Sequence, residues 1–130
     1  MPHITLEYSA NLEEPLDIAA LCVALRDAAV ATGVFPAAGI RVRAFAATHA
    51  VVADGDPAHG FVDIAVRIGA GRDIATQSRA ADEIFGAARE HTADYMARAP
   101  FMLSLDLREA VAETSRKDSS IRRFLPPELH

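Results

Sequence analysis

The chain contains the same pattern twice, and this doubling constrains its fold more than any other feature. A segment that alternates apolar and polar residues leads into a helical segment with an apolar stripe, and a second alternating segment follows. A period of two predicts half-buried strands, and a period near 3.6 predicts an amphipathic helix. The β-α-β pattern occupies residues 1–47 and again residues 61–109 of the 130 residues. We therefore expect one α/β domain over residues 1–130.

The first unit begins with HITLEYS, in which Ile4, Leu6 and Tyr8 alternate with polar residues. The segment EEPLDIAALCVALRDAAVATG predicts a helix, with Pro15 in its first turn and Gly33 at its C-terminal stop. The expected buried stripe of this helix is Ile18, Leu21, Cys22, Leu25 and Ala29. The segment IRVRAF predicts the second strand.

The second unit follows VVADGDPAHG, a segment dense in the residues typical of turns. FVDIAVRIG predicts a strand, and the next segment predicts a helix that begins after Asp73 as N-cap. The expected buried stripe of this helix is Ile74, Ala81, Phe85, Ala88 and Tyr95. FMLSLDLRE predicts the last strand. Right-handed crossovers would then place both helices on one face of a single four-stranded sheet.

The other face of that sheet carries charged residues from every strand. They are His3, Glu7, Arg41, Arg43, Asp63, Arg67, Asp106 and Arg108. This face either stays solvated, with weak ion pairs across strands, or packs against copies of itself in an oligomer. The tail, residues 110–130, favours the second interpretation because Ile121, Phe124 and Leu125 are apolar and could reach a neighbouring subunit.

Charge and composition exclude several classes of function. The net charge of −5 and the pI near 5.4 argue against binding to nucleic acid or to an anionic membrane. No run of about 18 apolar residues and no signal peptide is present, so we expect a cytoplasmic protein. Cys22 is the one cysteine and fits a small core position. The five histidines are scattered, and we expect no metal site.

Arginines near the predicted strand ends suggest an anionic substrate. Arg41 and Arg43 are two residues apart on one strand and so share a face, and Arg72 lies in the glycine-bearing turn IGAGRD before a helix. Such a turn offers backbone N–H groups to an anion, and guanidinium groups bind carboxylates in pairs of hydrogen bonds. A single arginine on a strand is more often structural than functional, and Arg43 could equally pair with Asp63.

Pro2 adds a candidate base. Removal of Met1, which aminopeptidases normally cut off before proline, would leave Pro2 as a secondary amine at the amino terminus. Burial and nearby arginines would lower the pKa of this amine toward neutrality, where it could act as a general base. Alone, Pro2 could also be no more than the end of an edge strand.

Five features together resemble the tautomerase superfamily, and within it the family of 5-carboxymethyl-2-hydroxymuconate isomerases of homoprotocatechuate degradation. These features are Pro2, the opening PHITLEYSANL, the doubled β-α-β, ATGVFPAAGIRVRAF and VRIGAGR. The resemblance spans most of the chain, and the pairing of the last two segments is more specific than either alone. The segment AATHAVVADGDPAHG has no aromatic residue before Phe61, so the pocket shape and substrate preference could differ from those of the family.

The resemblance implies a homotrimer and a cofactor-free ketonisation of a small di- or tricarboxylate. It implies that Pro2 moves the proton, that Arg41 and Arg72 bind substrate, and, with less support, that Arg43 does too. Two alternatives stay open. The chain could be a tautomerase-fold trimer that binds unsaturated carboxylates without turnover. It could also catalyse a different reaction, such as a decarboxylation or a dehalogenation, in which Glu7 or His3 takes part.

Overall fold

The structure is a computed structural model that describes residues 1–130. Six main elements follow one another in the order that the doubled sequence pattern predicts. They are β1 (His3–Ser9), α1 (Ile18–Ala31), β2 (Arg41–Ala47), β3 (Gly60–Ile68), α2 (Ile74–Arg98) and β4 (Phe101–Glu109). Short 3-10 turns lie between and after them, among them η2 (Ala37–Gly39) and η4 (Ile121–Phe124).

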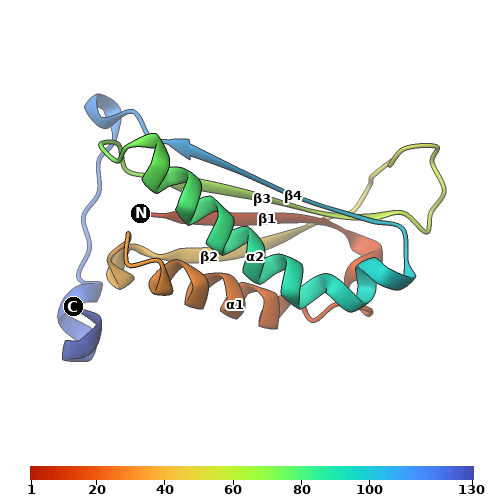
Figure 1. Cartoon of the computed structure of the whole chain (residues 1–130), viewed down its shortest axis with the longest axis horizontal. Coiled ribbons are helices and arrows are strands. Elements are labelled where there is room, and N and C mark those ends of the chain that lie inside the picture. The colour runs from red at the N-terminus through yellow and green to blue at the C-terminus, as the bar shows by residue number, and fades with distance from the viewer.

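The four strands form one sheet in the order β2-β1-β3-β4. Each β-α-β unit contributes a parallel pair, and the two units join through the antiparallel pairing of β1 with β3. Both helices lie side by side on one face of the sheet, as Figure 1 shows. The predicted tandem β-α-β fold, with two helices on one face of a four-stranded sheet, is confirmed.

The core lies between the sheet and the two helices. The central strands β1 and β3 supply side chains with essentially no exposed surface, and α1 supplies Leu21 and Leu25. The fully buried residues of the two strands are Ile4, Leu6, Val62, Ile64, Val66 and Ile68. Burying each such side chain stabilises the fold by about 1.5–3 kcal/mol. This core therefore holds the sheet and the helices in one rigid unit.

Helix α1 begins later than the sequence predicts. It starts at Ile18, where the carboxylate of Asp17 accepts a hydrogen bond from the Ala20 backbone N–H at 2.9 Å. Pro15 lies outside the helix, in the turn before it, so its predicted place in the first helical turn is wrong. The side-chain cap at Asp17 decides the boundary because it satisfies an N–H group that the first turn leaves unpaired.

Helix α2 has the predicted cap but a different buried stripe. Asp73 caps the helix by accepting from the Thr76 N–H at 2.8 Å, as expected. Ile74 is 78% exposed, and Thr92 is fully buried. The buried residues are Ala80, Ile84, Ala88, Thr92 and Tyr95, which shares only Ala88 and Tyr95 with the prediction. A search for apolar residues misses Thr92 because threonine is polar. Its burial is tolerated because its hydroxyl donates to the Ala88 carbonyl at 2.8 Å.

The face of the sheet opposite the helices is uncovered in the single chain. Its charged residues match the predicted set, and two large apolar side chains lie among them, Phe45 at 57% and Met102 at 62% exposed.

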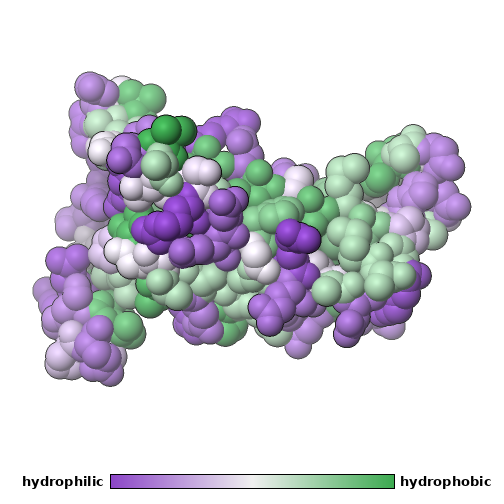
Figure 2. Space-filling view, in the orientation of Figure 1, coloured by the Kyte–Doolittle hydropathy of each residue, from purple (hydrophilic) through white to green (hydrophobic).

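Figure 2 shows the opposite, helical side of the molecule and the tail, where hydrophilic residues dominate at the left of the view. Neither helix combines the length and the apolar character that crossing a bilayer requires.

A valine pair tests the role of the core. Val62→Ala removes two buried methyl groups from β3, and we expect it to lower the free energy of unfolding by about 2 kcal/mol. Val51→Ala changes a side chain that is 87% exposed and should shift it by less than about 0.5 kcal/mol. Urea denaturation at equal protein concentration measures both, and equal losses would contradict this account of the core.

Candidate active site

The amino terminus lies at the end of the sheet where the parallel strands β1 and β2 both begin. Pro2 is fully buried, and its carbonyl accepts a hydrogen bond from the Arg41 backbone N–H at 3.1 Å. Met1 packs against the backbone of Gly39, where a Cβ atom would lie 2.7 Å from the Met1 nitrogen. Only glycine allows this close approach. The contacts of Gly39 and Arg41 thus position the amino terminus at this end of the sheet.

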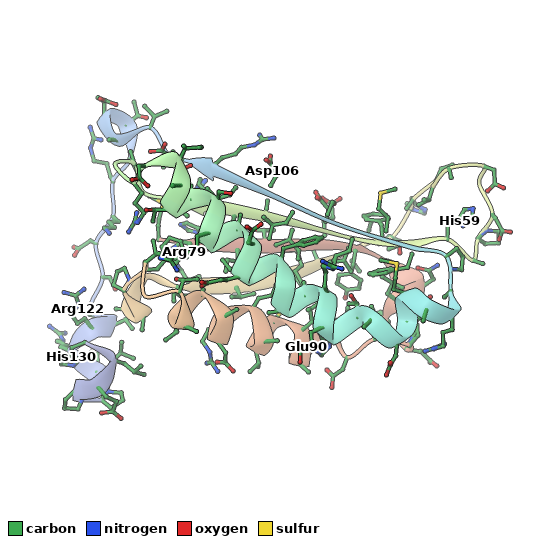
Figure 3. The ribbon with its side chains drawn as sticks, viewed as in Figure 1. His59, Arg79, Glu90, Asp106, Arg122 and His130 are labelled. Atoms are coloured by element: carbon green, nitrogen blue, oxygen red, sulfur yellow. The ribbon has the colours of Figure 1, made fainter.

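A cavity of about 510 Å³ opens beside the amino terminus. One wall comes from the chain start and from the turn that leads into β2, and the other comes from the C-terminal tail. The lining residues are Met1, Pro36, Ala38, Gly39, Arg41, Lys117, Asp118, Ser119, Ile121 and Arg122. Figure 3 places Arg122 at this end of the molecule and His59 at the opposite end.

The electrostatics of the cavity favour a neutral amine. Burial lowers the pKa of the amino-terminal ammonium group below its usual value of 8.0, and the positive charges of Lys117, Arg41 and Arg72 lower it further. Each of these effects disfavours the protonated form of the amine. In this structure the amine belongs to Met1, and Pro2 is an amide.

Of the predicted arginines, Arg41 lines the cavity itself. Its Nε–H group is 3.4 Å from the Gly39 carbonyl oxygen, and the side chain is exposed. No carboxylate of the chain forms a salt bridge with it. The guanidinium group can therefore bind an anion that enters the cavity.

Arg72 is not among the cavity-lining residues, although its charge reaches the amine. The guanidinium group donates to the carbonyl of Gly69 at 3.2 Å and to that of Val34 at 3.1 Å. It also lies over the ring of Phe35, 5.2 Å from the centroid. These contacts hold the side chain in one place and leave further N–H groups for an anion.

The turn before α2 differs from its predicted role as an anion site. The Gly71 N–H donates to the carboxylate of Glu109 at 3.1 Å, and Asp73 caps the helix. Gln77 connects the turn to β4, because its side-chain amide donates to the Arg72 carbonyl at 2.8 Å and to Glu109 at 2.9 Å. The chain's own carboxylates thus take up donors that the sequence suggested were free. Sequence reasoning missed Gln77 and Glu109, and no local motif marks them.

Arg43 lies on the uncovered face of the sheet. Its Nη1 is 3.2 Å from Nδ1 of His3, and because arginine can only donate, His3 must accept there and carry its proton on Nε2. Asp63 accepts instead from the Ser104 hydroxyl at 2.7 Å, so the pairing of Arg43 with Asp63 is not formed. Glu7 is exposed on this same face, opposite Asp63 in the sheet.

The cavity also contains two cations that sequence reasoning did not select, Lys117 and Arg122. They come from the segment SRKDSSIRR, whose density of basic residues is the signal that could have indicated them. No cluster of three or more His, Cys, Asp or Glu side chains is arranged to hold a metal ion.

The pKa of His3 offers a test of the positive charge around the start of β1 and β2. Burial, followed by the charges of Arg41, Arg67 and Arg43, lowers the pKa of His3 from 6.5 to about 4. Because the pKa is lower in the folded chain than in the unfolded one, His3 makes the fold less stable as the pH falls from 6.5 through 4. We expect Arg43→Ala to raise the pKa of His3, as followed by NMR titration. The distant Arg26→Ala should not change it, and an unchanged value in Arg43→Ala would contradict the assignment.

Comparison with known proteins gives a consistent result. Residues 2–125 match the sequence profile of the family described as 5-carboxymethyl-2-hydroxymuconate isomerase. The 5-carboxymethyl-2-hydroxymuconate Delta-isomerase of Escherichia coli is 31% identical over 121 residues, which cover 93% of this chain and 96% of that protein.

Solved structures agree with the sequence comparison. The crystal structure of a 5-carboxymethyl-2-hydroxymuconate isomerase from Deinococcus radiodurans R1 superposes with a TM-score of 0.88 at 34% identity, covering 96% of this chain and 95% of the other. The wild-type symmetric trimer of fused 4-OT shares the fold at 19% identity and a TM-score of 0.60, over 91% of this chain and 92% of the other. The profile match and the identity over nearly the whole length show that the chain belongs to the 5-carboxymethyl-2-hydroxymuconate isomerase family.

Proposed function

We propose that the protein converts 5-carboxymethyl-2-hydroxymuconate to its 2-oxo isomer without a cofactor, in the degradation of homoprotocatechuate. The observation that carries the proposal is the position of the amino terminus at a cavity lined by cations, where its amine has a lowered pKa. Membership of the 5-carboxymethyl-2-hydroxymuconate isomerase family supports this choice of substrate.

The base in this proposal is Pro2 after removal of Met1. Cleaving the bond between these two residues turns the proline nitrogen into a secondary amine at the start of β1. The hydrogen bond from the Arg41 N–H to the Pro2 carbonyl, 3.1 Å long, would keep that amine beside the cavity. Burial and the cations of the cavity would keep a fraction of it neutral near pH 7.

The reaction is a proton transfer along a conjugated dienol. The neutral amine of Pro2 takes the proton of the 2-hydroxyl group, and the oxygen electron pair forms the 2-oxo group. The double bonds shift, and the carbon at the far end of the diene takes a proton from the ammonium group. Arg41 and Arg72 bind carboxylates of the substrate and stabilise the negative charge that develops on the enolate. Arg43 is a further candidate for binding a substrate carboxylate, because it lies two residues after Arg41 on the same face of β2.

The assay follows the loss of dienol absorbance with protein whose lack of Met1 is verified by mass spectrometry. Pro2→Ala replaces the secondary amine with a primary one of different basicity and geometry, and we expect kcat/KM to fall on the order of 10²-fold. Arg41→Ala should also lower it strongly because the carboxylate loses its cation, and Arg43→Ala should lower it less.

Arg98→Ala is the matched control for the arginine variants. Arg98 stacks on Tyr95 at the far end of α2, and its loss should leave the rate unchanged. Unchanged rates in both Pro2→Ala and Arg41→Ala would contradict the mechanism. No turnover in wild-type protein lacking Met1 would instead favour a trimer that binds unsaturated carboxylates or catalyses another reaction.

We further propose that the chain forms a homotrimer through the uncovered face of the sheet. That face presents Phe45 and Met102 among charges of both signs, a combination that suits burial against copies of itself. The similarity to the symmetric trimer of fused 4-OT supports the same assembly.

Native mass spectrometry and sedimentation test this assembly. We expect three chains for the wild type, and a shift toward monomer for Phe45→Asp, which would bury a charge without a partner. Val51→Asp, on an exposed loop, should leave the trimer intact. A monomeric wild type at micromolar concentration would overturn the proposal.

A further inference from the structure

The C-terminal tail closes one side of the cavity at the amino terminus. It leaves β4 through a hydrogen bond from the Ala110 N–H to the Ile68 carbonyl at 2.8 Å, and then crosses the end of the sheet where β1 and β2 begin (Figure 1). In this chain the tail lies against its own turn η2 and helix α1. The predicted contact of residues 110–130 with a neighbouring subunit stays a prediction.

Apolar residues of the tail and of α1 line a second cavity. Ile121, Leu125 and Leu129 face Val30 and Ile40 across a largely apolar cavity of about 650 Å³ between the tail and α1. Ile121 also lines the cavity at the amino terminus, so the two cavities meet at this residue. The tail thus lies alongside α1, and Lys117 and Arg122 line the same cavity as Met1.

The tail carries four cations in this region, and they fall into two kinds. Arg116 donates to the carbonyls of Glu113 and Ser115, and Arg123 stacks on Phe124 at 5.1 Å. Lys117 and Arg122 line the cavity instead, and neither forms a salt bridge with a carboxylate of the chain.

The acid nearest in the sequence does not neutralise these two cations. Asp118 also lines the cavity, but its carboxylate accepts from the Ser119 N–H at 2.9 Å and is paired with neither Lys117 nor Arg122. The charge of Lys117 acts on the amino-terminal amine more strongly than that of Arg41. Two unpaired cations that line a cavity beside the amino terminus can together bind an anion.

The substrate of the proposed reaction has three carboxylates, and Arg41 and Arg72 can each bind one of them. 5-Carboxymethyl-2-hydroxymuconate carries two carboxylates on its diene chain and a third on its carboxymethyl branch. Arg41 and Arg72 account for two, whereas Arg43 does not line the cavity and contacts His3 on the uncovered face of the sheet. We propose that Lys117 and Arg122 form a third anion subsite, which binds the remaining carboxylate and selects tricarboxylates over dicarboxylates.

This inference rests on the proposed function for the identity of the substrate, and its test separates the two. Lys117→Met and Arg122→Gln remove one positive charge each while keeping most of the side-chain length. Arg116→Gln and Arg123→Gln are the matched controls, because these neighbours do not line the cavity. Lys117→Arg is the conservative variant that retains the charge.

The first measurement compares kcat/KM for 5-carboxymethyl-2-hydroxymuconate and for 2-hydroxymuconate. At a pH where the amine is fully neutral, we expect each loss of charge to lower the value for the tricarboxylate roughly tenfold. The value for the dicarboxylate should stay within about twofold, since neither substitution touches the two arginines. Equal losses on both substrates, or no loss on either, would overturn the subsite.

The second measurement is the pH profile. Removing the positive charge of Lys117 favours protonation of the amine, so the acidic limb of kcat/KM should move to higher pH in Lys117→Met. In Lys117→Arg the acidic limb of kcat/KM should lie at its wild-type pH, and Arg116→Gln should not move it. A limb that is the same in Lys117→Met and the wild type would contradict the placement of Lys117 beside the amine.

The third measurement does not depend on turnover. Isothermal calorimetry with tricarballylate and glutarate as inert ligands should show tighter binding of the tricarboxylate, and Lys117→Met should lose that preference even in a Pro2→Ala background. A preference that survives in Lys117→Met and Arg122→Gln would overturn the subsite. Loss of preference in a protein whose rate does not depend on Pro2 would support the subsite and overturn the proposed mechanism.

Discussion

The position of the first strand in the middle of the sheet is the constraint on which the rest of the site depends. β1 pairs with β2 on one side and with β3 on the other, so His3 lies opposite both Arg41 and Arg67. An internal strand cannot shift its register without moving its apolar side chains out of the core. The amino terminus is therefore held as firmly as the core itself, beside the arginine that begins β2.

The charged side chains of the uncovered sheet face and those at the amino terminus differ in their partners. On the uncovered face of the sheet, several polar side chains are partnered, as in the contacts of Arg43 with His3 and of Ser104 with Asp63. At the amino terminus, Arg41 and the cations of the tail have no salt-bridge partner within the chain. A concentration of unpaired positive charge is costly unless an anion binds there, and it also lowers the pKa of the neighbouring amine.

The sequence predicted the elements well because strand and helix periods are local properties. The alternation of Ile4, Leu6 and Tyr8 marks the buried face of β1, and each of these side chains is buried. The failures are contacts that a period does not contain. The apolar pattern extends α1 over Pro15, but the Asp17 cap begins the helix after it. The pattern also omits Thr92, which is polar, and its burial is possible because its hydroxyl donates to a carbonyl of its own helix.

By itself, the sequence determined the doubled α/β plan, the candidate base Pro2 and the arginines at positions 41 and 72. The tertiary structure decided which groups surround them. It occupied the Gly71 N–H with Glu109, paired Arg43 with His3, and brought Lys117 and Arg122 to the cavity at Met1. Lys117 is more than a hundred residues from Met1 along the chain. Folding joins them because the last strand ends at the edge of the sheet from which the tail crosses back to the first.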